Sequence, residues 1–461
     1  MISYWKIAIV GSGPAGFYSA AELLKQTAWS MKIDMFERLP TPFGLVRGGV
    51  APDHQQIKSV QKIFTRIAEN NNFRYFGNVE FGRDVFKTDL LEHYDAIIYA
   101  VGCATDRTLE IPGENLLGCH SASEFVAWYN GHPDYSNHKF DLSSQRAIVI
   151  GNGNVALDVA RILVKNPEEL AKTDIADNAL EELRSSQLEE IWLLGRRGPL
   201  QAAFSPIELK EFLKLSDVDL LIDKKVLELD AESLQILEKN SNNNVKQNFK
   251  ILKEISEKGV SGKKRRVHFM FLTSPIEIFG NNKVERISLV SNQLIKRKDG
   301  NFVTNATKEI NETSAGLVFR SIGYHGMPLL DLPFNQKTGT IPNERGQVKN
   351  IENENLLSNR EYVAGWIKRG ASGVIGTNKK DAVETVHQML TIFSREKILA
   401  SQNDKKPDIT KLLEHRKIDY VSFADWKLID QYETQLGIKQ GRPRVKITSK
   451  ADMLAVISKK S

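Results

Sequence analysis

The chain has 461 residues, of which 41% are hydrophobic and 26% are charged, and its formal net charge at pH 7 is +6. This length exceeds that of one ordinary hydrophobic core and predicts two or three domains. No apolar run approaches the roughly 18 residues of a membrane-spanning helix, so membrane insertion is not expected. The charge is too weak for this size to indicate nucleic-acid binding, although it is compatible with an acidic protein partner.

The N-terminus and the cysteines restrict the compartment and the chemistry. The first expected strand begins after only five residues, which leaves no room for a signal or transit peptide, so a cytoplasmic location is expected. Cys103 and Cys119 are the only cysteines, and they form neither a CxxC pair nor a metal-ligand pair. Disulfide-relay chemistry and a metal site are therefore not expected.

A strand, a glycine-rich turn and a helix follow one another at the start of the chain. Residues 6–10 have the apolar pattern of a buried strand, and residues 17–26 that of a helix. The turn between them has the GxGxxG spacing of a dinucleotide-binding motif. Its first glycine allows the tight turn, its second lets a pyrophosphate approach the backbone, and its third lets the helix pack on the strand. The turn consists of Gly11, Ser12, Gly13, Pro14, Ala15 and Gly16.

The second expected strand, residues 32–36, ends at an acidic residue. Glu37 lies 21 residues beyond Gly16, close to the spacing of about 20 expected for an acid that binds a ribose. A carboxylate accepts hydrogen bonds from free ribose hydroxyls but repels a ribose 2′-phosphate. The first motif is therefore predicted to bind FAD or NAD.

The segments that follow extend the first sheet and then leave it. Residues 39–54 form a glycine- and proline-rich loop that is expected to cover a binding site, before an amphipathic helix near 55–68. Strands are expected at 73–80 and 94–101. The turn-rich residues 103–142 are interpreted as a connection between domains.

A second strand–turn–helix unit has a different charge at its ligand end. Residues 146–150 are the expected strand and 156–164 the helix, and an inserted helical excursion delays the next strand to residues 191–194. That strand leads into Arg196 and Arg197, and guanidinium groups bind phosphate bidentately. The second unit is therefore predicted to bind NADPH through its 2′-phosphate. Its turn consists of Gly151, Asn152, Gly153, Asn154, Val155 and Ala156, the last being an accepted replacement for the third glycine.

The rest of the chain adds one further glycine-rich helix start. Residues 223–264 are rich in Lys, Glu and Asn with a helical middle and an exposed loop tip at 240–246, and no chemistry is assigned to them. Residues 362–370 form a strand that runs through a glycine-rich turn into a helix ending near residue 392. The tail from residue 401 is charged but contains buried-type aromatic residues, so it is expected to be ordered.

Two different dinucleotide sites in one chain restrict the reaction. NADPH in one domain and a flavin in the other imply hydride transfer from the nicotinamide to the isoalloxazine, because the cofactors carry that chemistry and the protein aligns them. The sequence contains no Gly-x-Ser-x-Gly elbow that would indicate a second catalytic apparatus.

Seven segments of the sequence together resemble adrenodoxin reductase and the bacterial NADPH-ferredoxin reductases. They are GSGPAGFYSA, FERLPTPFGLVRGGVAPDH, IGNGNVALDVARIL, LLGRRGPLQAAFSPIEL, RSIGYHGMPL, GWIKRGASGVIGTNKKDAVET and VSFADWKLID. The resemblance runs from end to end, although residues 223–315 carry none of it.

The resemblance implies an α/β fold with two Rossmann-like, three-layer dinucleotide-binding domains. An NADP-binding domain, residues 106–329, would be inserted into a discontinuous FAD-binding domain, residues 1–105 and 330–461. The implied FAD contacts are Ala15, Glu37, Leu45, Phe81, Trp366, Gly373, Val374 and Ile375. The implied NADP contacts are Asn152, Gly153, Asn154, Val155, Arg196, Arg197, Glu208 and Gly373.

Three of these positions, and His54 in addition, carry more specific expectations. Similar enzymes have a histidine and a glutamate near the nicotinamide and flavin rings, which gives His54 and Glu208 an orienting or proton-handling role; His54 is equally compatible with a helix cap or a packing group. Phe81 stands where a smaller apolar residue is common, so a backbone contact is expected there. Trp366 stands where many flavoproteins have a ribityl-binding Asp, which fits this family.

The resulting interpretation is an NADPH-ferredoxin reductase. Hydride transfer from NADPH to FAD is followed by single-electron transfer to an acidic iron-sulfur ferredoxin, of [2Fe-2S] or similar type. Candidate docking residues are Arg66, Arg74 and Lys368. The alternatives are an FAD-dependent NADPH monooxygenase and a non-catalytic flavin- and NADPH-binding subunit, while the thioredoxin-reductase type is disfavoured because CxxC is missing.

Overall fold

The computed structural model describes residues 4–239, 242–297, 302–351, 353, 356–395 and 406–459. The chain divides into two compact units: unit 1 contains Met1–Thr105 and Tyr324–Ser461, and unit 2 contains Asp106–Gly323. The chain passes between them through β5 (Thr105–Asp106) and β15 (Tyr324–His325), which form a two-stranded sheet. The return to unit 1 at Tyr324 lies six residues before the position expected from the sequence.

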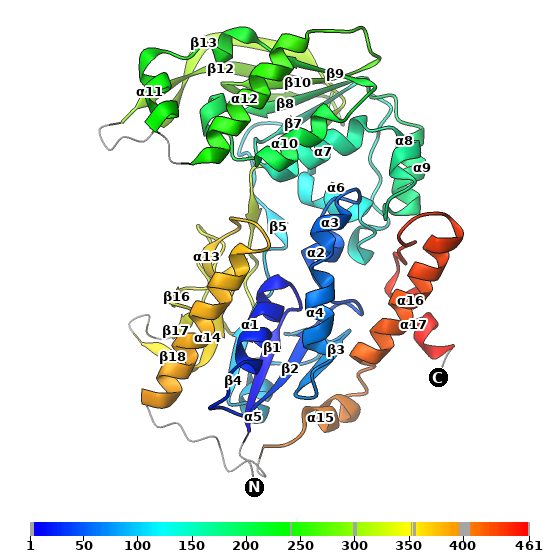
Figure 1. The fold of residues 1–461 in the computed structure, drawn as a ribbon, viewed down its shortest axis with the longest axis vertical. Coiled ribbons are helices and arrows are strands. Elements are labelled where there is room, and N and C mark those ends of the chain that lie inside the picture. Colours follow the sequence, from blue (N-terminus) through cyan, green and yellow to red (C-terminus); the bar gives the residue numbers. More distant parts are fainter. Residues whose placement is uncertain are drawn as a thin grey trace. The chain divides into compact units, whose positions relative to one another are not determined.

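Unit 1 is built on a seven-stranded sheet in the order β16-β17-β18-β4-β1-β2-β3 (Figure 1). The five strands from β18 to β3 are parallel, and β16 and β17 add an antiparallel edge. The strands are β1 (Trp5–Val10), β2 (Met31–Glu37), β3 (Phe73–Gly77), β4 (Ala96–Tyr99), β16 (Asn343–Glu344), β17 (Gln347–Lys349) and β18 (Leu357–Val363).

Helices cover both faces of this sheet because its central strands are apolar on both sides. Ile7 and Ile9 of β1 enter one core, which α1 and α14 help to form, and Ala8 and Val10 enter the opposite core. The helices are α1 (Pro14–Leu24), α2 (Leu45–Gly48), α3 (Gln55–Lys58), α4 (Gln61–Ala68), α5 (Lys87–His93), α13 (Trp366–Arg369), α14 (Thr377–Arg395), α15 (Ile409–His415), α16 (Phe423–Lys439) and α17 (Lys450–Ser458).

Unit 2 is built on a six-stranded sheet in the order β6-β14-β7-β8-β10-β9, in which every pairing is parallel. Its strands are β6 (Cys119–Ser121), β7 (Arg146–Ile150), β8 (Glu190–Gly195), β9 (Val218–Ile222), β10 (Arg265–Phe271) and β14 (Leu317–Arg320). A separate antiparallel sheet contains β11 (Thr273–Phe279), β12 (Arg286–Lys296) and β13 (Phe302–Ser314).

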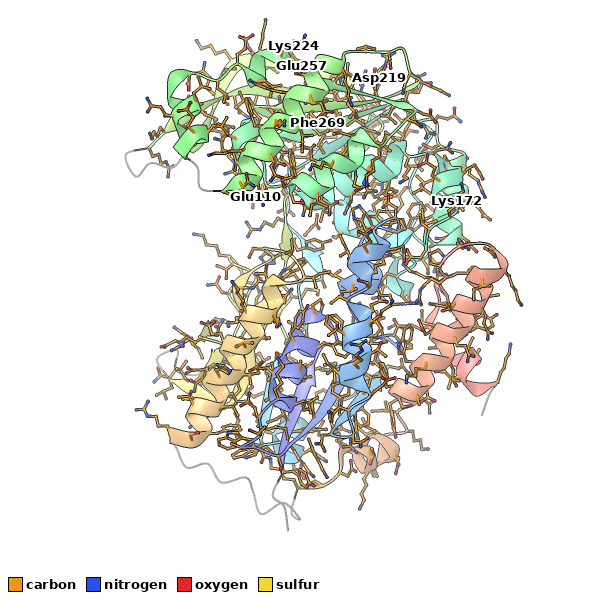
Figure 2. All side chains as sticks on the ribbon, in the orientation of Figure 1. Glu110, Lys172, Asp219, Lys224, Glu257 and Phe269 are labelled. Atoms are coloured by element: carbon orange, nitrogen blue, oxygen red, sulfur yellow. The ribbon has the colours of Figure 1, made fainter. Side chains whose placement is uncertain are left out.

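Helices cover one face of the parallel sheet in unit 2, and the antiparallel sheet covers the other. Ala147 and Val149 of β7 point into the helical core, whereas Ile148 and Ile150 pack with residues of β11 and β12. Figure 2 labels Phe269 of β10, which is buried in the helical core, and Lys224 and Glu257, which are exposed. The helices are α6 (Ala122–Tyr129), α7 (Asn154–Val164), α8 (Pro167–Leu170), α9 (Asp177–Arg184), α10 (Pro206–Leu213), α11 (Ala231–Lys239) and α12 (Asn243–Lys258), with 3-10 turns at Pro133–Tyr135, Pro199–Gln201 and Lys224–Leu227.

The interpretation of residues 103–142 as a connection between domains is wrong for much of this segment. α6 forms there, begun by a capping box between Ser121 and Glu124. Its aromatic residues Phe125 and Trp128 are fully buried in the helical core of unit 2. An apolar helix of this kind belongs to the domain that buries it.

Three other expectations have different outcomes. The helix expected near residues 55–68 is two helices, because α3 ends at Lys58 and α4 begins at Gln61. The loop tip expected at 240–246 lies partly outside the described residues, and residues 243–246 are the first turn of α12. The tail is ordered as expected over residues 406–459, where Trp426 is buried in the core of unit 1.

None of the described helices has the length and apolar character that crossing a membrane requires.

Candidate functional site

The first and third glycines of the turn in unit 1 are required by the fold itself. Gly11 has φ +105°, and a Cβ there would lie 2.5 Å from the carbonyl oxygen of Ala100. A Cβ at Gly16 would lie 2.2 Å from the carbonyl oxygen of Gly11. The chain after β4 therefore excludes a side chain at Gly11, and close packing of α1 on the turn excludes one at Gly16.

The second glycine has no such structural reason. Gly13 is the N-cap of α1, and a Cβ there would meet no protein atom within 4 Å. Pro14 has no N–H, and the N–H of Phe17 is the first that bonds back to Gly13. The N–H groups of Ala15 and Gly16 therefore have no intrahelical partner at a positively polarised helix end. An open backbone surface with such donors fits a pyrophosphate.

Glu37 at the end of β2 is fixed to this turn by hydrogen bonds. Its Oε2 accepts from the Ser12 N–H at 3.1 Å and from the Ser12 hydroxyl at 2.6 Å, and its Oε1 accepts from the Leu39 N–H at 3.1 Å. Each carboxylate oxygen has two lone pairs, so Oε2 is fully used and one acceptor site on Oε1 remains for the ribose. Burial and the nearby Glu37 raise the pKa of Tyr75 well above its ordinary value, so this neighbouring phenol stays neutral.

The loop after Glu37 lies directly over the glycine turn. Phe43 donates its N–H to the carbonyl oxygen of Ser12 at 3.0 Å, and a Cβ at Gly44 would lie 2.9 Å from Gly13 Cα. α2 starts immediately afterwards with Leu45, whose side chain is 37% exposed. The loop therefore covers the turn, as its length and composition indicate, and presents an apolar side chain beside it.

The end of β18 also lies close to the same turn. Gly365 has φ +81°, and a Cβ there would lie 2.6 Å from Ala15 Cβ. Its N–H donates to Asp381 Oδ2 of α14 at 2.5 Å. The late strand and the first glycine turn, which are about 350 residues apart in sequence, therefore meet at one place in unit 1.

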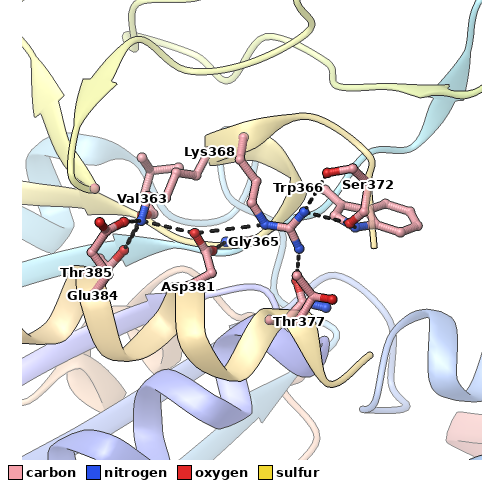
Figure 3. Close-up of polar contacts among 12 residues, drawn as sticks. Val363, Gly365, Trp366, Lys368, Ser372, Thr377, Asp381, Glu384 and Thr385 are labelled. Carbon is pink, nitrogen blue, oxygen red and sulfur yellow. Dashed lines mark hydrogen bonds and ion pairs between the residues drawn. The ribbon is translucent and has the colours of Figure 1, made fainter. Parts of the chain in front are cut away.

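A polar network holds the segment between β18 and α14 (Figure 3). Lys368 Nζ contacts Asp381 Oδ1 at 3.0 Å, Glu384 Oε2 at 2.7 Å and Thr385 Oγ1 at 3.1 Å. Lys368 is thus buried, and its positive charge is balanced by two carboxylates. Its interpretation as a docking residue is therefore wrong. A lysine so placed holds α13 to α14 instead.

The expected FAD contacts in this segment lie on its exposed side. Trp366 Nε1 donates to the carbonyl oxygen of Ser372 at 3.1 Å, and the same oxygen accepts from Arg369 Nη1 at 2.6 Å (Figure 3). These bonds fix the turn that carries Gly373, with φ +77°, and Val374, whose side chain is 60% exposed. Ile375 is partly buried against the core.

The positions of the remaining candidates of unit 1 give less information about binding. Phe81 is partly buried and contacts Tyr99 edge-on, with ring centroids 5.5 Å apart. His54 is the N-cap residue of α3, but its side chain makes no capping hydrogen bond, so the helix-cap alternative is wrong. Arg66 is exposed, whereas Arg74 pairs with Asp34 and Asp408, which reduces its attraction for an acidic partner.

The turn in unit 2 repeats the geometry of the first. Gly151 has φ +144°, and a Cβ there would lie 2.1 Å from the carbonyl oxygen of Ser321, whereas a Cβ at Gly153 would meet nothing within 4 Å. Gly153 is the N-cap of α7, Asn154 and Val155 are its first two residues, and Ala156 is fully buried against β7. This turn also offers open backbone at a helix N-terminus.

Two exposed cations stand at the end of β8. The backbone is fixed there, because Asn292 Nδ2 donates to the carbonyl oxygen of Arg196 at 3.1 Å and the Leu272 N–H donates to that of Arg197 at 3.1 Å. Both side chains are exposed. Within the part of the chain that the structure describes, neither guanidinium has an ion-pair partner, so both are available to an anionic ligand.

The segment after β8 is tied to the glycine turn and carries Glu208. Ala203 donates its N–H to the carbonyl oxygen of Asn152 at 2.8 Å, and Ser205 donates its N–H to Asn154 Oδ1 at 2.7 Å. Ser205 is also the N-cap of α10 and accepts from the Glu208 N–H at 3.4 Å. Glu208 is therefore a buried carboxylate in the first turn of a helix anchored to the turn.

Several residues that shape these sites were missed by sequence reasoning. Ser12 links Glu37 to the turn, Asp381 holds Gly365, and Asn292 holds the carbonyl of Arg196. The serine between two motif glycines offers a weak signal. The other two come from distant elements, and no local spacing marks them.

Comparisons with known proteins give a family and relatives that match along the whole chain. The family described as pyridine nucleotide-disulphide oxidoreductase matches residues 5–251. NADPH-ferredoxin reductase FprA of Mycobacterium tuberculosis is 48% identical over 459 residues, covering 98% of each chain. The mitochondrial NADPH:adrenodoxin oxidoreductase of Arabidopsis thaliana is 38% identical over 463 residues, covering 97% of this chain and 94% of the relative. A solved structure of M. tuberculosis FprA in complex with NADPH has a TM-score of 0.91 and 46% identity, covering 99% of this chain and 100% of that one.

Proposed function

Because the chain belongs to the pyridine nucleotide-disulphide oxidoreductase family, and within it to the NADPH-ferredoxin reductases, we propose that it transfers electrons from NADPH through FAD to a ferredoxin. The observation that carries the assignment is the opposite charge at two similar turns. A carboxylate, Glu37, faces the turn in unit 1, while two exposed guanidinium groups, those of Arg196 and Arg197, lie at the matching strand end in unit 2.

Unit 1 would hold FAD. Gly13, Ala15 and Gly16 offer backbone and N–H groups to the pyrophosphate, and Glu37 accepts from the ribose hydroxyls. Leu45 and Val374 supply exposed apolar contacts. Backbone contacts are expected from the remaining positions, which are Pro14, Phe81, Trp366, Gly373 and Ile375. Bound FAD supplies the conversion of a two-electron hydride equivalent into single electrons.

Unit 2 would hold NADP(H). Gly153 admits the pyrophosphate, α7 directs its N-terminal N–H groups at it, and Arg196 and Arg197 bind the 2′-phosphate by charge-assisted hydrogen bonds. Glu208 and His54 would orient the reacting groups or exchange protons with solvent. Hydride transfer itself requires no side-chain acid.

The named relatives indicate a ferredoxin or adrenodoxin as the electron acceptor. We infer that it is an acidic iron-sulfur ferredoxin, because the chain has a net charge of +6. Electrostatic attraction of this kind accelerates encounter and makes the rate fall with salt. A cytoplasmic location is expected, and cell fractionation tests it.

An anaerobic titration of the purified protein with NADPH tests the proposal. The visible spectrum should show bound flavin and should bleach as NADPH is added. Added ferredoxin should then pass electrons to cytochrome c in the steady state. A protein without flavin, or a flavin that NADPH does not reduce, would contradict the assignment. NADPH oxidation that requires oxygen and an organic substrate would favour the monooxygenase instead.

A further inference from the structure

A carboxylate in the C-terminal part of the chain is completely buried. Glu433 of α16 is 0% exposed. A buried charge is tolerated only when it is paired and hydrogen-bonded. The partners of Glu433 therefore show what the fold gains from keeping it.

Most partners of Glu433 are close to it in the sequence, but the principal one, Arg47, precedes it by 386 residues. Arg47 Nη1 and Nη2 donate to the two carboxylate oxygens at 2.9 and 2.5 Å, which is a bidentate pair. Arg444 Nη1 at 3.1 Å and the Ile447 N–H at 2.8 Å complete the shell. Burial alone would raise the pKa of the Glu433 carboxyl, but Arg47 and Arg444 hold it below its ordinary value, so it is charged.

Arg47 itself lies in the loop that covers the glycine turn of unit 1. The Trp426 ring lies 5.1 Å from its guanidinium, and Lys446 Nζ donates to its carbonyl oxygen at 3.3 Å. Together, Arg47, Trp426, Glu433, Arg444 and Lys446 form what we term the C-terminal clamp. Apart from Arg47, every member comes from the last part of the chain.

The loop needs such external support. α2 has four residues, far fewer than the length at which a helix is stable alone. The two residues before it, Phe43 at φ +84° and Gly44 at φ +49°, have left-handed backbone conformations, which are costly for phenylalanine. The same two residues touch Ser12 and Gly13. Their position over the turn therefore depends on contacts made elsewhere, which are the burial of Phe43 and Val46 in the core and the bidentate pair of Arg47.

We propose that Glu433 is a positioning residue for the FAD site: acting through Arg47, it holds residues 43–48 over Gly13, so that the C-terminal clamp controls FAD retention. This inference rests on the proposed binding of FAD by unit 1. It assigns a cofactor-related role to α16, whose clamp residues contact the loop that covers the turn.

The experiment compares FAD release from matched variants of the full-length holoprotein. Glu433→Gln keeps the shape of the side chain but removes its charge, and Arg47→Lys keeps a cation but loses the bidentate geometry. The control is Arg416→Lys. Arg416 also makes a bidentate pair, with Asp89 at 2.6 and 2.9 Å, and also joins the tail to the body of unit 1, but away from the loop.

Flavin fluorescence measures the FAD dissociation rate, visible circular dichroism of the bound flavin reports its surroundings, and the Tm of each apoprotein reports stability. We expect Glu433→Gln and Arg47→Lys to release FAD at least about tenfold faster, a change of about 1.4 kcal/mol, and to alter the flavin signal. Arg416→Lys should release FAD at the wild-type rate even if its Tm falls.

Three results separate the possibilities. Unchanged release and an unchanged flavin signal in both clamp variants would overturn the inference, as would equally fast release from Arg416→Lys. Should Glu433→Gln fail to fold, Arg47→Lys decides alone. A wild-type protein that binds no FAD would instead refute the proposed function, independently of the clamp.

Discussion

The two glycine turns share one backbone design. In each, the first glycine has a positive φ and no room for a Cβ, while the second has open space. In each, a residue of the loop that follows the second strand donates its N–H to the residue between these glycines: Phe43 to Ser12, and Ala203 to Asn152. The surface proposed to hold a pyrophosphate is thus made twice from main-chain groups, with little dependence on side chains.

The turns differ in what their side chains do. Ser12 bonds to the carboxylate of Glu37, whereas Asn152 lies so close to Gly195 that a Cβ there would be 2.7 Å from its Nδ2. Beyond that glycine stand two arginines. The loop over the first turn is anchored by the buried Arg47–Glu433 pair, and that over the second by Asn154. In the proposals above, the strand end sets the choice of nucleotide and the loop sets its retention.

The largest effects are expected from alanine at the glycines. Gly11→Ala and Gly151→Ala should lower the free energy of unfolding by about 2–4 kcal/mol, because each combines a strained φ with a backbone clash. Gly13→Ala and Gly153→Ala should change it by less than about 1 kcal/mol. Each should nevertheless weaken its own dinucleotide by roughly 100-fold, about 2.8 kcal/mol. Urea unfolding and titration of each cofactor measure both quantities. Wild-type affinity in Gly13→Ala would show that no ligand approaches there.

Arg196→Ala and Arg197→Ala test the charge that distinguishes the second turn. If each guanidinium makes one charge-assisted contact with the 2′-phosphate, worth about 1.5–3 kcal/mol, NADPH affinity should fall about 10- to 150-fold. NADH affinity should barely change, since it lacks that phosphate. Single-turnover flavin reduction at varied NADPH and NADH measures both. Equal losses for the two nucleotides would place the arginines elsewhere in the mechanism.

Glu37→Gln tests the charge that distinguishes the first turn. The amide keeps the size of the side chain but weakens the acceptors for the Ser12 N–H and for the ribose hydroxyls. We expect FAD affinity to fall about 5- to 30-fold, or about 1–2 kcal/mol. Reconstitution of the apoprotein measures FAD affinity, and NADP⁺ binding to unit 2 is the internal control. A parallel loss of NADP⁺ affinity would show that the two sites are not separately specified.

The features that sequence predicts well here are local ones. β1, β2, β7 and β8 lie where short apolar runs indicate strands, and the glycines stand at the ends of the first strand of each pair. A motif such as GxGxxG belongs to a strand, a turn and a helix that here span only residues 5–24, so its meaning requires no knowledge of distant contacts. Glu37 follows from the expected spacing after the motif, whereas Arg196 follows from its place at the end of the next strand, which an insertion delays.

The features that sequence misses depend on partners far along the chain. A lysine is usually exposed, yet Lys368 is buried where it pairs with Asp381 and Glu384 of α14. The aromatic segment of α6 looks like part of a linker until the core of unit 2 is known. The antiparallel sheet of β11 to β13 lies where the sequence offers no motif. Tertiary contacts override local pattern at each of these places.

The smallest expected effect is a pH dependence of the free energy of unfolding. It concerns the first turn, because it arises from the C-terminal clamp. Arg47 and Arg444 hold the pKa of Glu433 below its ordinary value near 4.5 against the raising effect of burial. A depressed folded-state pKa contributes stability that is fully present above the unfolded-state pKa and is lost as pH falls through the folded-state value. The difference in free energy of unfolding between wild type and Glu433→Gln should therefore be constant from pH 7 to about 5.5. Below about pH 4.5 it should shrink, by at most about 1.4 kcal/mol per pH unit for one proton. Urea unfolding from pH 7 to pH 3.5 measures this difference, and the glutamine, which does not titrate, is the reference. A difference that stays constant to pH 3.5 would mean that the pKa of the Glu433 carboxyl is the same in the folded and unfolded protein, and that Arg47 and Arg444 do not lower it.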